Sequence, residues 1–297
     1  MEHGGGRPQA GGRDEDGGVS ADGIMATVPF AGGAASLTAP RRLTATLAAL
    51  MAAQALLGRL LPHLYRDDGW VRSTWFGNDL VTLLLALPVL LAGLRLAGGG
   101  SRRGALLWVG GFGYAVYNYA FYLLGAELNA FFPLYAAAEV VAAAALILLL
   151  SSIDAARLAA GLPPGAPVRA LGGYFTVLGL GLAAVWLGMW AAYVFAGRPT
   201  PVATDAFRLV AALDVTLMVP ALACGGVLLW RRHAWGLVVA SLAGVQGALY
   251  LVVLAVNTAV AIVEGLVAAP AELPVWGPLA MTTAVATTVL IGCVDRR

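Results

Sequence analysis

The sequence predicts an all-α protein, a polytopic bundle of about eight transmembrane helices. Of its 297 residues, 60% are hydrophobic and only 11% are charged, whereas soluble domains carry about 25% charged residues. Apolar runs near 20 residues, the length that crosses a bilayer, recur along the chain. Each run is bounded by Arg, Gly, Pro or Asp. This length and pattern suit one membrane domain.

The chain divides into a tail and that domain. Residues 1–40 are Gly-rich and polar and include the acidic run Asp14–Asp16, so we expect a disordered N-terminal tail. Met25 within it is an alternative start of translation. Residues 41–297 form the single transmembrane helical domain.

The first predicted helix follows Arg41 and runs to Leu61, where Pro62 stops it. The polar segment His63–Asp79 is interpreted as an external loop, with Trp70 and Trp75 at the level of the lipid headgroups. The remaining predicted helices are Leu80–Leu96, two helices within Gly110–Ile153 joined at Glu127–Asn129, Leu171–Ala196, Phe207–Trp230, Trp235–Val263 and Val275–Val294.

Arginine sets the predicted orientation. Eight helices place Arg59, Arg66, Arg72, Arg198 and Arg208 on one side and a larger set on the other. By the positive-inside rule the richer side is cytoplasmic, so both termini are cytoplasmic. The richer side carries Arg41, Arg42, Arg95, Arg102, Arg103, Arg157, Arg169, Arg231, Arg232, Arg296 and Arg297.

All basic residues are Arg, and none is Lys. Together with abundant Ala, Gly, Leu and Val, this indicates a GC-rich bacterial genome and hence the bacterial plasma membrane. The missing Lys excludes a retinal or pyridoxal Schiff base and a phosphate-loop lysine. No HExxH or GxSxG motif is present and the three His are scattered, so we expect no cofactor and no metal. The Arg residues flank helices, which argues against a nucleic-acid surface.

Eight helices also allow a four-plus-four duplication, in which Arg102-Arg103 and Arg231-Arg232 precede equivalent helices. The alternative is that the two Arg pairs match by chance. Small residues at spacing four predict close helix packing on two helices. They are Ala184, Gly188 and Ala192 on one, and Gly236, Ala240, Gly244 and Ala248 on the other.

Four polar residues, Asn118, Glu139, Asp214 and Asn257, lie at a similar depth nearer the outside, at about 1.5 Å per helical residue. A charged side chain within the bilayer costs roughly 2.5–3.5 kcal/mol, so such residues usually face a cavity or a partner. We predict that they converge on one water-accessible pocket that opens to the outside. At helical spacing, the predicted pocket also includes Tyr114, Tyr122, Gln246 and Tyr250.

Two alternatives remain for these acids. Each carboxyl could be protonated or hydrogen-bonded and simply tie helices together, or Arg59 could pair with one of them. Pro220, six residues beyond Asp214, should kink its helix. Such a kink suits either a moving helix or a static shape.

The segment Tyr117–Tyr135, YNYAFYLLGAELNAFFPLY, resembles a stretch in uncharacterised multi-pass membrane proteins of bacteria. In that stretch Tyr-Asn-Tyr-Ala is followed by a short Gly-Ala-x-x-Asn turn. The resemblance covers less than a tenth of the chain. It implies a multi-pass membrane protein but no activity and no site residues.

Three functions are consistent with these features. The first is a transporter or permease for a small polar or cationic solute, with the lipid bilayer as its other partner. The alternative is a sensor or assembly subunit that binds a ligand or protein in the same pocket. The third is a lipid-modifying membrane enzyme with Glu139 or Asp214 as acid or base, which no nucleophile or metal set supports. The sequence gives no indication of oligomeric state.

Overall fold

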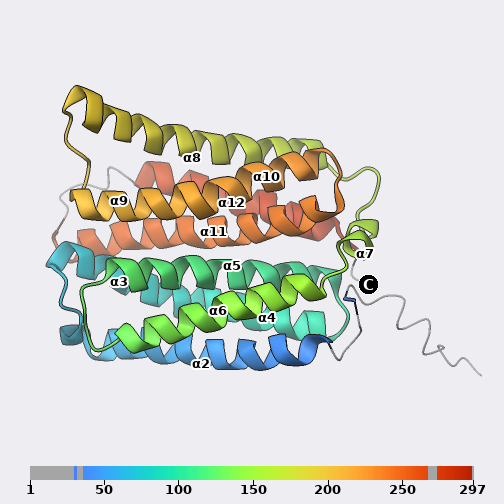
Figure 1. Cartoon of the computed structure of the whole chain (residues 1–297), viewed down its shortest axis with the longest axis horizontal. Coiled ribbons are helices and arrows are strands. Elements are labelled where there is room, and N and C mark those ends of the chain that lie inside the picture. The colour runs from blue at the N-terminus through green and yellow to red at the C-terminus, as the bar shows by residue number, and fades with distance from the viewer. Residues whose placement is uncertain (1–29, 32–35, 267–272, 296–297) are drawn as a thin grey trace, which may run out of the picture.

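The computed structural model describes residues 30–31, 36–266 and 273–295, and nearly all of them are helical. Figure 1 shows the helices side by side along the longest axis, with α2–α6 in one group and α8–α12 in the other. The predicted all-α bundle is confirmed. Its elements are α2 (Thr38–Leu60), the 3-10 turn η2 (Pro62–Leu64), α3 (Gly69–Val81), the π-helical turn η3 (Thr82–Ala86), α4 (Leu87–Gly98), α5 (Arg102–Gly125), α6 (Phe132–Ser152), α7 (Ala155–Ala160), α8 (Val168–Ala196), α9 (Thr204–Leu213), the π-helical turn η4 (Asp214–Met218), α10 (Val219–Trp230), α11 (Ala234–Val263) and α12 (Leu273–Cys293).

Most of the predicted tail, including Met25, lies outside the described residues. Within the described part, Phe30 is buried and forms an isolated antiparallel bridge with Ile153, beyond the end of α6. Helix α2 starts at Thr38, slightly before the predicted start at Arg41.

Seven described helices are long and apolar enough to cross a membrane, counting α3 to α4 and α9 to α10 as one helix each. The chain is therefore a multi-pass membrane protein. The remaining long helix, α5, has 24 residues, of which 15 are buried. The tyrosines and glycines of α5 face protein instead of lipid, so this helix does not need apolar side chains for contact with lipid. This explains why α5 is less apolar than its neighbours.

The second predicted helix is longer than the apolar run suggested. The structure forms one helix from Gly69 to Gly98, so the interpretation of His63–Asp79 as an external loop is wrong for its second half. Asp68 caps the start of this helix by accepting a hydrogen bond from the Val71 amide, as Asp commonly does at a helix N-terminus. Trp75 is buried within the protein, whereas Trp70, at the start of this helix, is exposed.

Two helices contain a π-helical turn immediately before a proline. Turn η3 precedes Pro88 and turn η4 precedes Pro220. A proline ring clashes with the carbonyl four residues earlier and leaves it without its helical donor, and a widened turn relieves both problems. Near Pro220, where a kink is predicted, the helix contains a π turn.

The two groups of helices have the same order of elements, and three element starts recur at a separation of 132 residues. Each contains four long helices, and the second of the four is interrupted by a π turn in both. The matching starts are Thr82 and Asp214 for the π turns, Leu87 and Val219 for the helices after them, and Arg102 and Ala234 for the helices that follow.

One close contact between helices also recurs at this separation. A Cβ atom added at Gly93 would lie 2.5 Å from the backbone nitrogen of Trp108, and one added at Gly225 would lie 2.9 Å from that of Ala240. Both glycines and both contact residues are 132 positions apart. We infer an internal duplication of a four-helix unit: a first half, α2–α6, and a second half, α8–α12. Because each unit has an even number of long helices, both have the same orientation, as parallel repeats do.

The pairs Arg102-Arg103 and Arg231-Arg232 both lie at the beginning of the third long helix of their group, but they are offset by three residues in this register, in which Arg102 matches Ala234. Small-residue packing is confirmed on α11, where Gly236 meets the backbone of Leu228 and Leu229. It is wrong for Gly188 on α8, where an added Cβ would meet no atom within 4 Å.

Candidate functional site

Asp79, on α3, lies at the centre of a buried hydrogen-bonded cluster. Its carboxyl accepts bonds from Gln54 Nε2 (3.0 Å), Tyr122 Oη (2.8 Å) and Tyr65 Oη (2.9 Å). Gln54 comes from α2, Tyr122 from α5 and Tyr65 from the loop after α2, so three segments converge on one acid. All three donors are neutral. Asp79 and these partners are the Asp79 cluster.

Further contacts fix this cluster. Tyr119 donates to Gln54 Oε1 at 3.2 Å, which directs the Gln54 amide group toward Asp79. Gly58 on α2 leaves the space that the Tyr65–Asp79 bond occupies, because a Cβ there would overlap both side-chain oxygens. Burial, and secondarily the nearby Asp79 carboxyl, raises the pKa of Tyr65 above its ordinary value, so Tyr65 remains a neutral donor.

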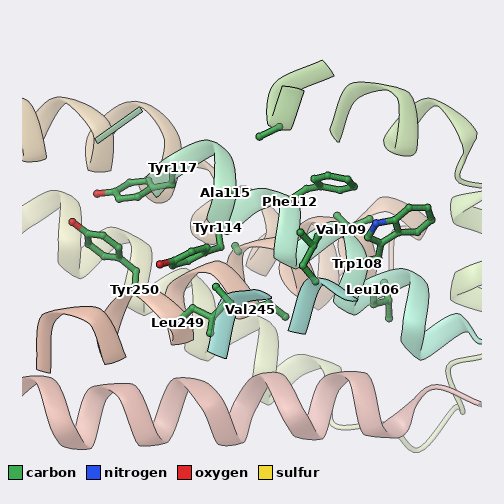
Figure 2. Close-up of a cluster of buried hydrophobic side chains, with 14 of the residues drawn as sticks. Leu106, Trp108, Val109, Phe112, Tyr114, Ala115, Tyr117, Val245, Leu249 and Tyr250 are labelled. Carbon is green, nitrogen blue, oxygen red and sulfur yellow. The ribbon is translucent and has the colours of Figure 1, made fainter. Parts of the chain in front are cut away.

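Asp214 is the second buried acid and begins the π turn η4. Its Oδ1 accepts a 2.5 Å bond from Tyr117 Oη on α5, and its Oδ2 accepts a 2.8 Å bond from Trp186 Nε1 on α8. The Tyr117 ring packs edge-on against Tyr250 of α11, with centroids 4.6 Å apart. Figure 2 shows the hydroxyl ends of Tyr114, Tyr117 and Tyr250 directed to the same side. These residues join the two halves, because α5 belongs to the first half and Asp214 to the second.

The partners of Asp214 determine where it can hold a proton. An indole N–H only donates, so Oδ2 must remain an acceptor. A tyrosine hydroxyl both donates and accepts, so Oδ1 can accept from Tyr117 as a carboxylate oxygen or donate to it as a protonated acid. The same geometry therefore accommodates both protonation states, with the proton confined to Oδ1 at the contact between the halves.

The other π turn has the same relation to α5. Thr82, which begins η3 and matches Asp214 in the repeat, shares a 3.0 Å hydrogen bond with Tyr114 Oη. Each π turn thus presents a polar first residue to a tyrosine of α5. In the first half this residue is a hydroxyl and in the second a carboxyl, so only the second can change charge.

The two acids lie at different levels along α5. Asp79 bonds to Tyr122 and Asp214 to Tyr117, and these tyrosines are five residues, or about 7 Å, apart on that helix. Asp214 is ten residues from the start of α9 at Thr204, which corresponds to about 15 Å, or about half of the bilayer's hydrocarbon thickness. Neither acid forms an ion pair with a described residue. The Arg59 guanidinium lies over the Phe76 ring at 4.7 Å instead, so the alternative pairing with an acid does not occur in this structure.

The structure distributes the eight predicted site residues among several environments. Asp214 lies near Tyr250 through Tyr117, Tyr122 belongs to the Asp79 cluster, and Tyr114 bonds to Thr82. The Asn257 amide group lies 3.4 Å from Asn78 Oδ1, in a contact between α11 and α3 that the absence of a side chain at Gly77 permits. With its amide turned over, Asn257 donates to the carbonyls of Thr74 (3.0 Å) and Val253 (3.2 Å). The Gln246 side chain lies beside Gly113 on α5.

Asn118 is fully buried, and neither atom of its amide group has a hydrogen-bond partner. Glu139 on α6 is half-buried, and its Oε2 is enclosed without a partner. Helix α6 packs mainly against α2 and α5 of its own half. Neither of the two surface cavities described below is lined by any of the eight residues.

The sequence interpretation missed the centre of the first cluster. Asp79 was placed in a loop, and its partners Gln54 and Tyr65 were not considered. One signal was available: the Asp68-Gly69 pair can cap a helix that begins well before the apolar run. Trp186 carried no signal, since a single Trp in an apolar helix is common.

Among the described residues, no three His, Cys, Asp or Glu side chains gather in a way that could hold a metal ion. Comparison of the chain with protein-family models, with curated proteins and with solved structures gave no match. The proposals below therefore rest on the geometry.

Replacing Glu139 with Leu should raise the free energy of unfolding by about 1 kcal/mol, because an enclosed oxygen without a partner carries an unrecovered desolvation cost. Glu139→Gln should leave the protein folded. Thermal unfolding in detergent micelles measures both. Glu127→Leu, at an exposed loop position, is the matched control and should give no gain. A less stable Glu139→Leu protein would show that this carboxyl has a bonding role.

Proposed function

We propose that the protein is a transporter for a small polar or cationic solute, in which protonation of Asp214 is linked to relative motion of the two halves. One observation carries this proposal: a titratable carboxyl on a π turn of the second half is held by Tyr117 of the first half. An acid buried at this depth is costly, and such acids commonly mark ion or proton pathways.

The internal duplication supports this function. Many transporters consist of two repeats and place substrate and coupling ions near the midplane, where the repeats meet. The contact of Asp214, on a helix of the second half, with Tyr117 on α5 of the first half supports such a position. The arginine-rich ends of the helices are proposed to be cytoplasmic, in a bacterial plasma membrane.

The proposed coupling follows from hydrogen-bond chemistry. A bond from Tyr117 to a carboxylate is charge-assisted and roughly twice as strong as a neutral one. Protonation of Oδ1 removes the charge and leaves the weaker neutral bond, so the contact between the halves loosens. The adjacent π turn, whose backbone bonding is already irregular, gives the helix a place to bend.

The test is reconstitution into liposomes with an entrapped pH-sensitive dye, followed by addition of amino acids, polyamines and small sugars in turn. The native protein should move protons with at least one solute class. Asp214→Asn should abolish that movement, because the amide keeps its hydrogen-bonding shape but cannot titrate. Glu139→Gln, which removes another membrane acid, should retain more than half of the rate.

Two results would contradict the proposal. Full proton movement by Asp214→Asn would exclude this acid as the coupling group. The second result is solute uptake that does not depend on a pH gradient, in the native protein and in Asp214→Asn. Transport would then occur without the proposed coupling to protons.

One observation favours the alternative of an assembly subunit. Helix α8 packs mainly on α10, and its opposite face is exposed, with open space beside Gly181 and Gly188. Small residues of this kind allow another membrane helix to approach closely. Native mass spectrometry of the detergent-solubilised protein before and after Gly188→Leu would show whether this face holds a second chain.

A further inference from the structure

A groove of about 640 Å³ opens between the two halves at the arginine-rich end of the bundle. It lies where α4 ends and α5 begins, beside the last turns of α12, at the end marked C in Figure 1. Its rim carries Arg95, Arg103 and Ser101, and its walls are mostly apolar. The other lining residues are Leu96, Gly99, Leu107, Thr287, Thr288, Ile291 and Gly292.

The two arginines on this groove differ in their surroundings. Arg103 donates from Nε to the Val294 carbonyl and from Nη2 to the Gly292 carbonyl, both at 2.6 Å, and so holds α5 to the end of α12. Its other Nη group has no described partner. The Arg95 side chain is exposed, and its guanidinium forms no hydrogen bond or ion pair with any described residue. The groove therefore carries two positive charges that no described acid neutralises.

A second, apolar cavity continues the groove along α12. It measures about 260 Å³ and is lined by Met281, Ala284, Val285, Thr288 and Val289. Thr288 lines both cavities. From Gly292 to Met281 the helix advances about 16 Å, close to the roughly 15 Å of hydrocarbon in one leaflet. Charge at one end and an open apolar surface that continues along the helix match the two parts of a phospholipid.

We propose that this groove binds an anionic phospholipid, with the phosphate at Arg95 and Arg103 and one acyl chain along the Met281–Val289 face of α12. Guanidinium groups bind phosphate oxygens through directed, charge-assisted bonds. Basic pockets between membrane helices at the cytoplasmic side commonly hold anionic headgroups. The bound lipid would contact both halves, because α4 and α5 belong to the first and α12 to the second. The proposal does not depend on the transport function.

The experiment is native mass spectrometry of the purified full chain, titrated with dioleoylphosphatidylglycerol, dioleoylphosphatidylcholine or glycerol phosphate. The native protein should bind the anionic lipid at least fivefold more tightly than the zwitterionic one, and glycerol phosphate should not form a stable adduct. Arg95→Gln should weaken binding of the anionic lipid about fivefold, as one surface arginine typically contributes. Arg95→Lys should retain most of it.

Two further variants distinguish the contribution of the apolar cavity to lipid binding from that of positive charge. Val285→Trp, at an exposed position that fills the apolar cavity, should weaken the lipid adduct while leaving the melting temperature unchanged. Arg169→Gln removes an exposed arginine at the same end but outside the groove, and should leave lipid binding unchanged. Equal effects of Arg95→Gln and Arg169→Gln would overturn the site. Equal binding of both lipids, or tight binding of glycerol phosphate alone, would also overturn the proposed occupant.

Discussion

Replacing Asp79 with Leu should lower the free energy of unfolding by about 3 kcal/mol, because three buried donors lose their acceptor at once. Tyr65 would lose the acceptor of its hydroxyl, Gln54 would keep only its 3.1 Å bond to Tyr65 Oη, and Tyr122 only its longer 3.3 Å bond to the Trp75 carbonyl. The cluster also joins α2, α3 and α5, so its loss should loosen the first half as a unit. Thermal or SDS-induced unfolding measures the change.

Asp79→Asn is the matched control and should cost at most about 1 kcal/mol. The Asn carbonyl oxygen can accept from Gln54 and Tyr122, while its amide group donates to Tyr65, whose hydroxyl also accepts. If Asn and Leu destabilise equally, the cluster requires the negative charge itself. If neither destabilises, the hydrogen bonds of Asp79 contribute nothing to folding.

The sequence predicts the class of fold well because membrane-spanning segments must be long and apolar. The extent of the second helix is predicted poorly, because only its apolar part is recognised in the sequence. Residues 69–79 form the first turns of that helix and contact other protein helices, so they are polar and aromatic. A hydropathy pattern identifies helix surfaces that face lipid, but it does not identify a helix surface that other protein helices cover. The low apolarity of α5 has the same cause.

The candidate site was predictable only in part. Asp214 stood out because an acid within an apolar run has a high desolvation cost. Its partners did not, because the order of helices around the bundle brings Tyr117 and Trp186 to it from two different helices. Glu139 carried the same signal as Asp214 and has no comparable partner. The cost of burying an acid therefore identifies candidates, and only the packing distinguishes between them.

The repeat was hidden by sequence divergence. Its most visible sign, the two arginine pairs, lies in the wrong register by three residues. The constraint that both halves share is steric, at the glycines where adjacent helices touch, and at the proline after each π turn. Pro88 and Pro220, like Gly93 and Gly225, are separated by 132 residues. A few glycines and prolines are too common in membrane helices to reveal a register without the contacts.

Replacing either Gly93 or Gly225 with Ala should therefore destabilise the protein by similar amounts, about 2 kcal/mol each. A Cβ at Gly93 would meet backbone atoms of Trp108, and one at Gly225 would meet those of Ala240. Backbone atoms within a helix cannot move aside independently, so α4 must separate from α5, and α10 from α11. The free energy of unfolding in SDS-detergent mixtures is the measurement.

Gly181→Ala and Gly188→Ala on α8 provide the control, because a Cβ at either position meets no atom within 4 Å. There the replacement should be neutral or stabilise by about 0.5 kcal/mol, since Ala favours the helix more than Gly does. The double variant Gly93→Ala/Gly225→Ala should show the sum of the single effects, as the two contacts lie in different halves and share no partner. Tolerance at one of the two glycines with a large loss at the other would show that the halves no longer share this packing constraint. The two halves would then share the order of their helices but not this close contact.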